Sequence, residues 1–222
     1  MAFHHSPKIP NSGLLLALDG ASVKSNPRTG TTWRDLSGNG NHFTVPSNSN
    51  TGTDVNLSNT IASRGALSGT YNTSESTFDT WFYIGNNGTY TGCCDTLFGT
   101  YWFRTFIISQ SLYTMIGFMN SSGSYLYYQH PAYSVAYGQW HHTLGMRRGD
   151  RYIIWLNGVE VYNTSYGSGE FLWGFGGGSG SWYIGGNRHP DFKVGAARVW
   201  NRGLSDTEIV EMYNSQRNRF SS

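Results

Sequence analysis

The stretch RYIIWLNGVEVY, residues 151–162, decides the fold class because it holds the clearest local signal in the chain. Asn157-Gly158 predicts a β-hairpin, since both central positions of a two-residue type I′ turn need a positive φ. Pairing outward from this turn sets Ile154 opposite Val161. The alternating apolar residues on this face form the predicted core side of the hairpin.

The opposite face of the hairpin carries Ile153, Trp155, Glu160 and Tyr162. Large apolar side chains are costly to leave in water, so this face is either covered by a loop or presented to a partner. Trp155 and Tyr162 are therefore candidate contact residues for a glycan or a protein.

Short aromatic segments with regular turn breaks precede the hairpin, which is typical of an all-β protein. The segment TFDTWFYI, residues 77–84, places Phe82 on one face and Asp79, Trp81 and Tyr83 on the other. The other predicted strands lie in residues 13–20, 96–109, 111–120 and 124–130.

A helix is predicted only at the C-terminal end, in LSDTEIVEMY, residues 204–213. Ser205 stands three residues before Glu208, which is the spacing of a capping box. Ile209 and Met212 mark one apolar face. We expect this helix to pack on the edge of a sandwich.

Composition agrees with many strands and turns, because 16% of the 222 residues are aromatic, 13% are charged and 29 are glycine. A net charge of +2 argues against a nucleic-acid partner, and no apolar run approaches a membrane-spanning length of about 20 residues.

Cys93 and Cys94 are adjacent, at a Cα separation of about 3.8 Å, whereas disulfides prefer roughly 4.4–6.8 Å. We interpret them as ordinary reduced loop cysteines.

Five ordered blocks carry a resemblance to a known family. They are SGLLLALDGASVKSNPRTGTTWRDLSGNGNHF (12–43), STFDTWFYI (76–84), GQWHHTLGMRRGDRYIIWLNGVEVY (138–162), WYIGGNR (182–188) and KVGAARVWNRGLSDTEIVEMYNSQRNRF (193–220). The chain resembles laminin-G-like, concanavalin A-like lectin/glucanase domains, especially those in structural proteins of tailed bacteriophages. The phage association depends on the N-terminal arm, the first block and YNSQRNRF, residues 213–220. Residues 89–103 and 163–182 depart from the family pattern.

The resemblance and the strand pattern together predict an all-β fold, a jelly-roll β-sandwich of two antiparallel sheets with one short C-terminal helix. Residues 1–12 are expected to form an N-terminal arm and residues 13–222 the jelly-roll domain. Family members serve glycan-binding or assembly roles, but a fold alone does not give a function.

The loop TTWRDLSGNGNHF, residues 31–43, is predicted to be a structural corner. Asn and Gly supply positive φ, Asp35 can cap the turn and Trp33 can pack beneath it. Calcium is the functional alternative, because Asp19, Asp35 and Asn39 offer hard oxygen ligands. Their spacing matches no dedicated calcium loop, so no cofactor is required and calcium stays open.

No catalytic set is recognisable in the sequence. The related glucanases place two glutamates and an aspartate at alternating positions of one strand, and no glutamate of this chain fits that pattern. Glu208 and Glu211 lie on one helix turn and are expected to be solvated. His141 and His142 point to opposite sides of a strand, so we expect one in the core and one exposed.

The best binding signal is the loop EFLWGFGGG, residues 170–178. Three large aromatic residues among glycines either tuck over the Trp155/Tyr162 face or form a contact surface. Polar residues after the loop could bind sugar hydroxyls. The candidates are Phe171, Trp173, Phe175, Asn187, Arg188 and Asp191.

The arm holds two apolar anchors, Phe3 and Ile9, among prolines that exclude it from a helix or a central strand. It either docks on another chain as an extended segment or folds back on its own sandwich.

Taken together, these features favour a non-enzymatic phage virion protein, a capsid decoration, tail fibre or tail-associated component with a lectin-like domain. Its expected partners are other virion proteins and host-surface glycans, with a homo-oligomer also open. Residues 1–10 lack the apolar core of a signal peptide, so we expect the protein to be assembled into the virion in the host cytoplasm. The alternatives are a stand-alone carbohydrate-binding module and, least favoured, a glycoside hydrolase.

Overall fold

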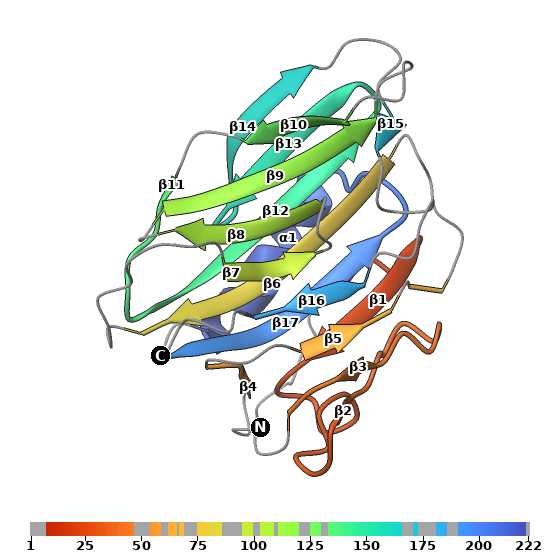
Figure 1. Ribbon diagram of the computed structural model, residues 1–222, viewed down its shortest axis with the longest axis vertical. Coiled ribbons are helices and arrows are strands. Elements are labelled where there is room, and N and C mark those ends of the chain that lie inside the picture. The colour runs from red at the N-terminus through yellow and green to blue at the C-terminus, as the bar shows by residue number, and fades with distance from the viewer. Residues whose placement is uncertain are drawn as a thin grey trace.

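The computed structural model describes residues 8–46, 54–58, 62–65, 67–68, 75–85, 95–99, 103–108, 111–119, 125–129, 133–165, 171–172, 181–185 and 191–220. Within them the chain forms two antiparallel sheets, which lie face to face in Figure 1. This confirms the predicted jelly-roll sandwich.

The first sheet is seven-stranded and contains the predicted hairpin. Its order is β1 (Leu14–Asp19), β17 (Phe192–Trp200), β6 (Glu75–Ile84), β12 (Gln139–Arg148), β13 (Arg151–Leu156) and β14 (Val159–Ser165), with β4 (Val55–Asn56) paired to β17.

The second sheet is ten-stranded and lies in front of the first in Figure 1. Its order is β10 (Tyr125–Gln129), β9 (Ser111–Met119), β8 (Phe103–Ile108), β7 (Asp95–Gly99), β16 (Trp182–Ile184), β5 (Ala62–Arg64), β3 (Phe43–Thr44) and β2 (Thr32–Trp33), with β11 (Tyr133–Ser134) and β15 (Phe171–Leu172) paired to β9.

The main core lies between the sheets, where strand alternation brings apolar side chains from both together. Phe82 and Tyr152 enter it from the seven-stranded sheet, and Trp33, Phe43 and Trp182 enter it from the ten-stranded sheet. All five side chains are buried. Trp33 thus packs beneath the 31–43 loop, as predicted.

The outer face of the seven-stranded sheet is also covered, by α1 (Asp206–Gln216) and η1 (Arg217–Arg219). Figure 1 shows α1 behind the sheet, on the side away from the ten-stranded sheet. Ile209 and Met212 pack there against Ile153 and Trp155. The prediction that the helix lies on the edge of the sandwich is wrong. The apolar face of the helix covers the second apolar face of the strands, which a place at the edge would leave in water.

The helix begins at the predicted capping box. The Ser205 side chain accepts a hydrogen bond from the Glu208 backbone N–H at 3.2 Å, and the Glu208 carboxylate accepts one from the Ser205 N–H at 2.8 Å. In the part of the chain that the structure describes, no helix has the length and apolar content of a membrane span.

The 151–162 hairpin has the predicted turn, with φ of 51° at Asn157 and 78° at Gly158. Its predicted register is wrong beyond the turn, because an irregularity after Ile154 pairs this residue with Tyr162 and not with Val161. One extra residue in β14 shifts every later side chain to the opposite face.

The end of the arm folds back on its own domain. Ile9 packs against the cluster under the helix, and the Pro10 carbonyl accepts a hydrogen bond from Trp200 Nε1 at 2.7 Å. Lys8 pairs with Glu211 at 3.1 Å. Of the two alternatives for the arm, the contacts of Ile9 therefore support the one in which it folds back on its own sandwich. Phe3 lies outside the described residues.

Candidate functional site

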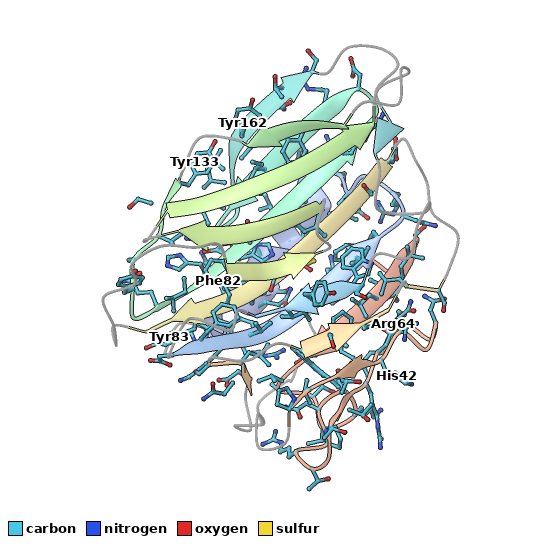
Figure 2. The ribbon with its side chains drawn as sticks, viewed as in Figure 1. His42, Arg64, Phe82, Tyr83, Tyr133 and Tyr162 are labelled. Atoms are coloured by element: carbon cyan, nitrogen blue, oxygen red, sulfur yellow. The ribbon has the colours of Figure 1, made fainter. Side chains whose placement is uncertain are left out.

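The predicted Trp155/Tyr162 contact face does not exist as one surface. Trp155 is buried under α1, with 6% of its area exposed. Tyr162 lies on the other side of the sheet, against the main core, with its ring centroid 6.5 Å from that of Tyr152. The irregularity after Ile154 is the physical reason, because it turns Tyr162 to the face of Tyr152. In Figure 2, Tyr162 accordingly appears beside Tyr133, which donates a hydrogen bond to the Val161 carbonyl of the same strand.

Most of the aromatic loop and of the candidates that follow it lies outside the described residues. The backbone of Phe171 pairs with Met119 in the ten-stranded sheet. Five of the predicted contact side chains lie outside the described residues: Phe171, Trp173, Phe175, Asn187 and Arg188. Cys93 and Cys94 lie outside them as well. Asp191 is described and half-buried.

The 31–43 loop is a structural corner built around one carboxylate. Asp35 Oδ1 accepts hydrogen bonds from the backbone N–H of Ala17 and Ser37, each at 2.8 Å. Asp35 Oδ2 accepts from the Asn41 N–H at 2.9 Å. Since Asp35 is nearly buried and its oxygens already accept these bonds, the carboxylate holds the loop against β1.

The three calcium candidates do not converge. Asp19 pairs with Arg219, whose Nη1 lies 2.8 Å from Asp19 Oδ2, and the Asn39 amide donates to the Leu14 carbonyl at 3.0 Å. Burial alone would raise the pKa of Asp19, but the hydrogen bonds and charge of Arg219 outweigh burial and lower it. Within the described residues, no group of three or more metal-ligating side chains forms.

Both histidines of β12 are buried, so the prediction that one is exposed is wrong. His141 Nε2 bonds to the Ala136 carbonyl at 2.9 Å, on the core side. Burial lowers the pKa of His141, and that hydrogen bond opposes the shift only in part. His142 lies on the outer face, where the helix covers it; the Trp81 ring centroid is 4.9 Å away.

His142 belongs to a buried polar cluster that joins the sheet to the helix. Asp79 Oδ2 accepts hydrogen bonds from His142 Nε2 at 3.0 Å and from Arg198 Nη1 at 2.9 Å. Arg198 Nη2 donates to Gln216 Oε1 of α1 at 2.5 Å. A histidine–aspartate pair could serve proton transfer, but a substrate cannot reach these side chains, which are at most 3% exposed. The cluster therefore fixes the helix to the sheet.

A group of half-buried side chains lies on the same outer face of the seven-stranded sheet, beyond the part that α1 and η1 cover. Tyr83 of β6 stands opposite Trp140 of β12 and Lys193 of β17, and Lys193 stands opposite Asn56 of β4. Directly opposed residues of antiparallel strands share a face. We name Asn56, Lys193, Tyr83 and Trp140 the outer row; Figure 2 labels Tyr83 near the end of β6.

The aromatic part of the outer row is held rigidly. The Tyr83 and Trp140 ring centroids are 5.7 Å apart, and Lys193 Nζ lies 4.8 Å from the Tyr83 centroid. Phe220 supports Trp140 from the helix side at 4.9 Å. Phe220 can lie close to β17 because Gly195 has no side chain; an added Cβ would meet the Phe220 ring at 2.1 Å. Three strands and the C-terminal turn thus fix the two rings without a ligand.

Among the predicted contact residues whose side chains the structure describes, Asp191 lies beside the outer row. Its carboxylate rests over Gly85, where an added Cβ would be 1.7 Å from Oδ2. The Gly85 N–H donates to the Asp191 carbonyl at 2.8 Å, which fixes this position against the end of β6. The outer row itself presents two aromatic faces, an ammonium and an amide. Such a set can stack on a sugar ring and bind its hydroxyls.

The sequence matches the Concanavalin A-like lectin/glucanases superfamily over residues 37–210. No curated protein matches the chain. Among solved structures, the binding domain of botulinum neurotoxin serotype D is similar at 14% identity and a TM-score of 0.69, covering 93% of this chain and 51% of that one.

Two further structures are similar. The binding domain of Paraclostridial Mosquitocidal Protein 1 has 14% identity and a TM-score of 0.69, with 93% of this chain and 53% of that chain covered. A Trypanosoma rangeli sialidase in complex with sialic acid has 13% identity and a TM-score of 0.66, with 96% and 35% covered. The chain spans about half the length of the toxin domains. At these identities the likeness concerns the fold.

Proposed function

Because the chain belongs to the concanavalin A-like lectin/glucanases superfamily, we propose that it is a non-catalytic, lectin-like domain that binds carbohydrate on its outer row. The observation that carries this proposal is the fixed pair of rings, Tyr83 and Trp140, with the ammonium of Lys193 beside Tyr83. Rings held in place before binding lose little conformational entropy when a ligand arrives.

The burial of Asp79 supports a binding role over a catalytic one. Glycoside hydrolysis uses two carboxyl groups on either side of the scissile bond. Asp79, the carboxylate that pairs with a histidine, is sealed under α1. Two of the similar solved structures are named as binding domains of toxins, which also supports binding.

The biological setting that we propose is the virion of a tailed phage. Support comes from the resemblance of residues 12–43 and 213–220 to the corresponding blocks of phage structural proteins. In this setting the domain is a decoration, fibre or tail-associated part, assembled with other virion proteins in the host cytoplasm, and the outer row contacts host-surface glycans. Immunogold labelling of assembled particles tests this setting, and absence of label from the particles would contradict it.

A stand-alone carbohydrate-binding module would use the same surface, so sugar binding itself is tested first. A glycan array probed with the wild-type domain and with Trp140→Ala is expected to show selective signals that the variant loses. We expect a loss of at least about tenfold in affinity, corresponding to about 1.4 kcal/mol, as for other aromatic anchors.

Tyr183→Ala is the matched control. Tyr183 is also half-buried, but it lies in β16 of the other sheet. Its replacement is expected to leave binding unchanged. Loss of binding in Tyr183→Ala, with normal binding by Trp140→Ala, would move the site to the ten-stranded sheet and refute the proposal.

A further inference from the structure

The ammonium of Lys193 has surroundings that differ from those of the other two lysines. Of the three lysines in the sequence, Lys8 pairs with Glu211 and Lys24 is exposed. Lys193 lies within the sheet, with Nζ 4.8 Å from the Tyr83 ring centroid. A lysine ammonium carries three N–H donors. Among the residues that the structure describes, no carboxylate lies within ion-pair distance of Lys193.

The neighbouring carboxylate does not neutralise Lys193. Asp191 precedes Lys193 by two residues, which separates their Cα atoms by roughly 6.6 Å at the usual rise per residue of a strand. The Asp191 carboxylate lies over Gly85 instead, close to the backbone of β6. An anion could therefore approach Lys193.

A second donor stands directly across from Lys193. Asn56 pairs with Lys193 in the ladder between β4 and β17, which places the two Cβ atoms roughly 5 Å apart. Asn56 Oδ1 accepts a hydrogen bond from the Ser58 N–H at 2.9 Å. The amide nitrogen of Asn56 is therefore its remaining polar group, and it can only donate. An ammonium and an amide donor side by side suit an oxyanion.

We infer that Lys193 and Asn56 bind the oxyanion of an acidic saccharide, a carboxylate or a sulfate, while the sugar ring stacks on Tyr83 and Trp140. This inference rests on the proposed function and adds its ligand class. The aromatic rings supply affinity for saccharides in general, and the Lys193–Asn56 pair supplies the preference for a charged one. Because the pair is partly exposed, salt screens its charge and weakens the preference.

The test is isothermal titration calorimetry with three probes of equal length. They are a galacturonic acid oligosaccharide, the same oligosaccharide after reduction of its carboxyl groups, and a sulfated galactose oligosaccharide. The wild-type domain is expected to bind at least one acidic probe about tenfold more tightly than the neutral probe. The tighter of the two acidic probes identifies carboxylate or sulfate as the preferred oxyanion.

Three variants separate the inference from the proposed function. Lys193→Gln is expected to bind all three probes with the affinity that the wild type shows for the neutral one. Trp140→Ala is expected to weaken all three, and Lys24→Gln, an exposed control, is expected to change none. A thermal unfolding curve for Lys193→Gln that matches the wild type excludes a folding defect.

The outcomes distinguish failure of the inference from failure of the proposed function. Equal binding of acidic and neutral probes by the wild type, with loss in Trp140→Ala, would overturn the inference and leave the proposed function standing. An acidic preference that survives Lys193→Gln would also overturn the inference. Failure of the wild type to bind any saccharide, both here and on the array, would overturn both.

Discussion

Replacing Asp79 with alanine is expected to destabilise the domain severely. The carboxylate is fully buried and accepts hydrogen bonds from His142 at 3.0 Å and from Arg198 at 2.9 Å. Its removal leaves the Arg198 guanidinium, itself 3% exposed, without the carboxylate that accepts its hydrogen bond. Breaking a buried ion pair in this way costs about 3–5 kcal/mol. That is a large part of the roughly 5–15 kcal/mol by which domains are stable.

Urea unfolding followed by tryptophan fluorescence measures this loss, because several buried tryptophans report on both faces of the sheet. Asp206→Ala is the control. Asp206 pairs with Arg148 at 2.8 Å, but its side chain is 60% exposed, so its loss is expected to cost less than about 1 kcal/mol. Equal and small effects of the two variants would refute the idea that the buried cluster holds the helix on the sheet.

The double variant Asp79→Leu/Arg198→Met refines the result. It removes both charges and leaves no uncompensated one, so it is expected to cost less than the sum of the two single changes. An additive result would show that Asp79 and Arg198 act independently, contrary to their hydrogen bond of 2.9 Å.

The remaining predictions concern pH and close packing. Burial lowers the pKa of His141, so the unfolded chain binds the proton at a higher pH than the folded chain does. The free energy of unfolding is therefore expected to fall as the pH drops below about 6.5. Unfolding curves of His141→Gln across this range should lose that pH dependence. The pKa of Glu208 is lowered to about 2, chiefly by its hydrogen bond with Arg202, so the stability it provides is present above about pH 4.5 and lost as the pH falls toward 2. Glu208→Gln should reduce this loss of stability at low pH by no more than about 1 kcal/mol, since the Glu208–Arg202 pair is partly exposed. The same loss in the variant and the wild type would contradict the role of Glu208. Gly195→Ala should displace the Phe220 ring, because an added Cβ would lie 2.1 Å from a ring carbon. The melting temperature should fall and the protease sensitivity of the C-terminal turn should rise, whereas wild-type values of both would contradict the close packing of Phe220 on Gly195.

The sequence was sufficient for the fold because the signals for its elements are local. Asn157-Gly158 specifies a turn through backbone conformation, and Ser205 with Glu208 specifies a helix start through hydrogen bonds across three residues. The role of Asp35 in the 31–43 corner could likewise be predicted from turn chemistry.

Features that depend on packing between distant segments could not be predicted. Whether α1 covers a sheet face or an edge is decided by contacts such as those of Met212 with Trp155. The irregularity after Ile154, which moves Tyr162 to the core side, has no sequence signal as strong as the turn beside it.

The outer row was missed for the same reason. Alternation in residues 77–84 placed Tyr83 on the face opposite Phe82. Nothing in the order of residues shows that Lys193 and Trp140, more than fifty positions apart, flank Tyr83 on either side. Sequence reasoning therefore favoured the glycine-rich aromatic loop, where three rings lie close together along the chain.

The most direct test of the central claim is a two-dimensional NMR titration of the wild-type domain with a saccharide that the array identifies. If the outer row binds carbohydrate, the largest shift changes should fall on the Trp140 indole N–H and on the amides of Tyr83 and Lys193. Shift changes confined to the ten-stranded sheet, around Tyr183, would contradict the account.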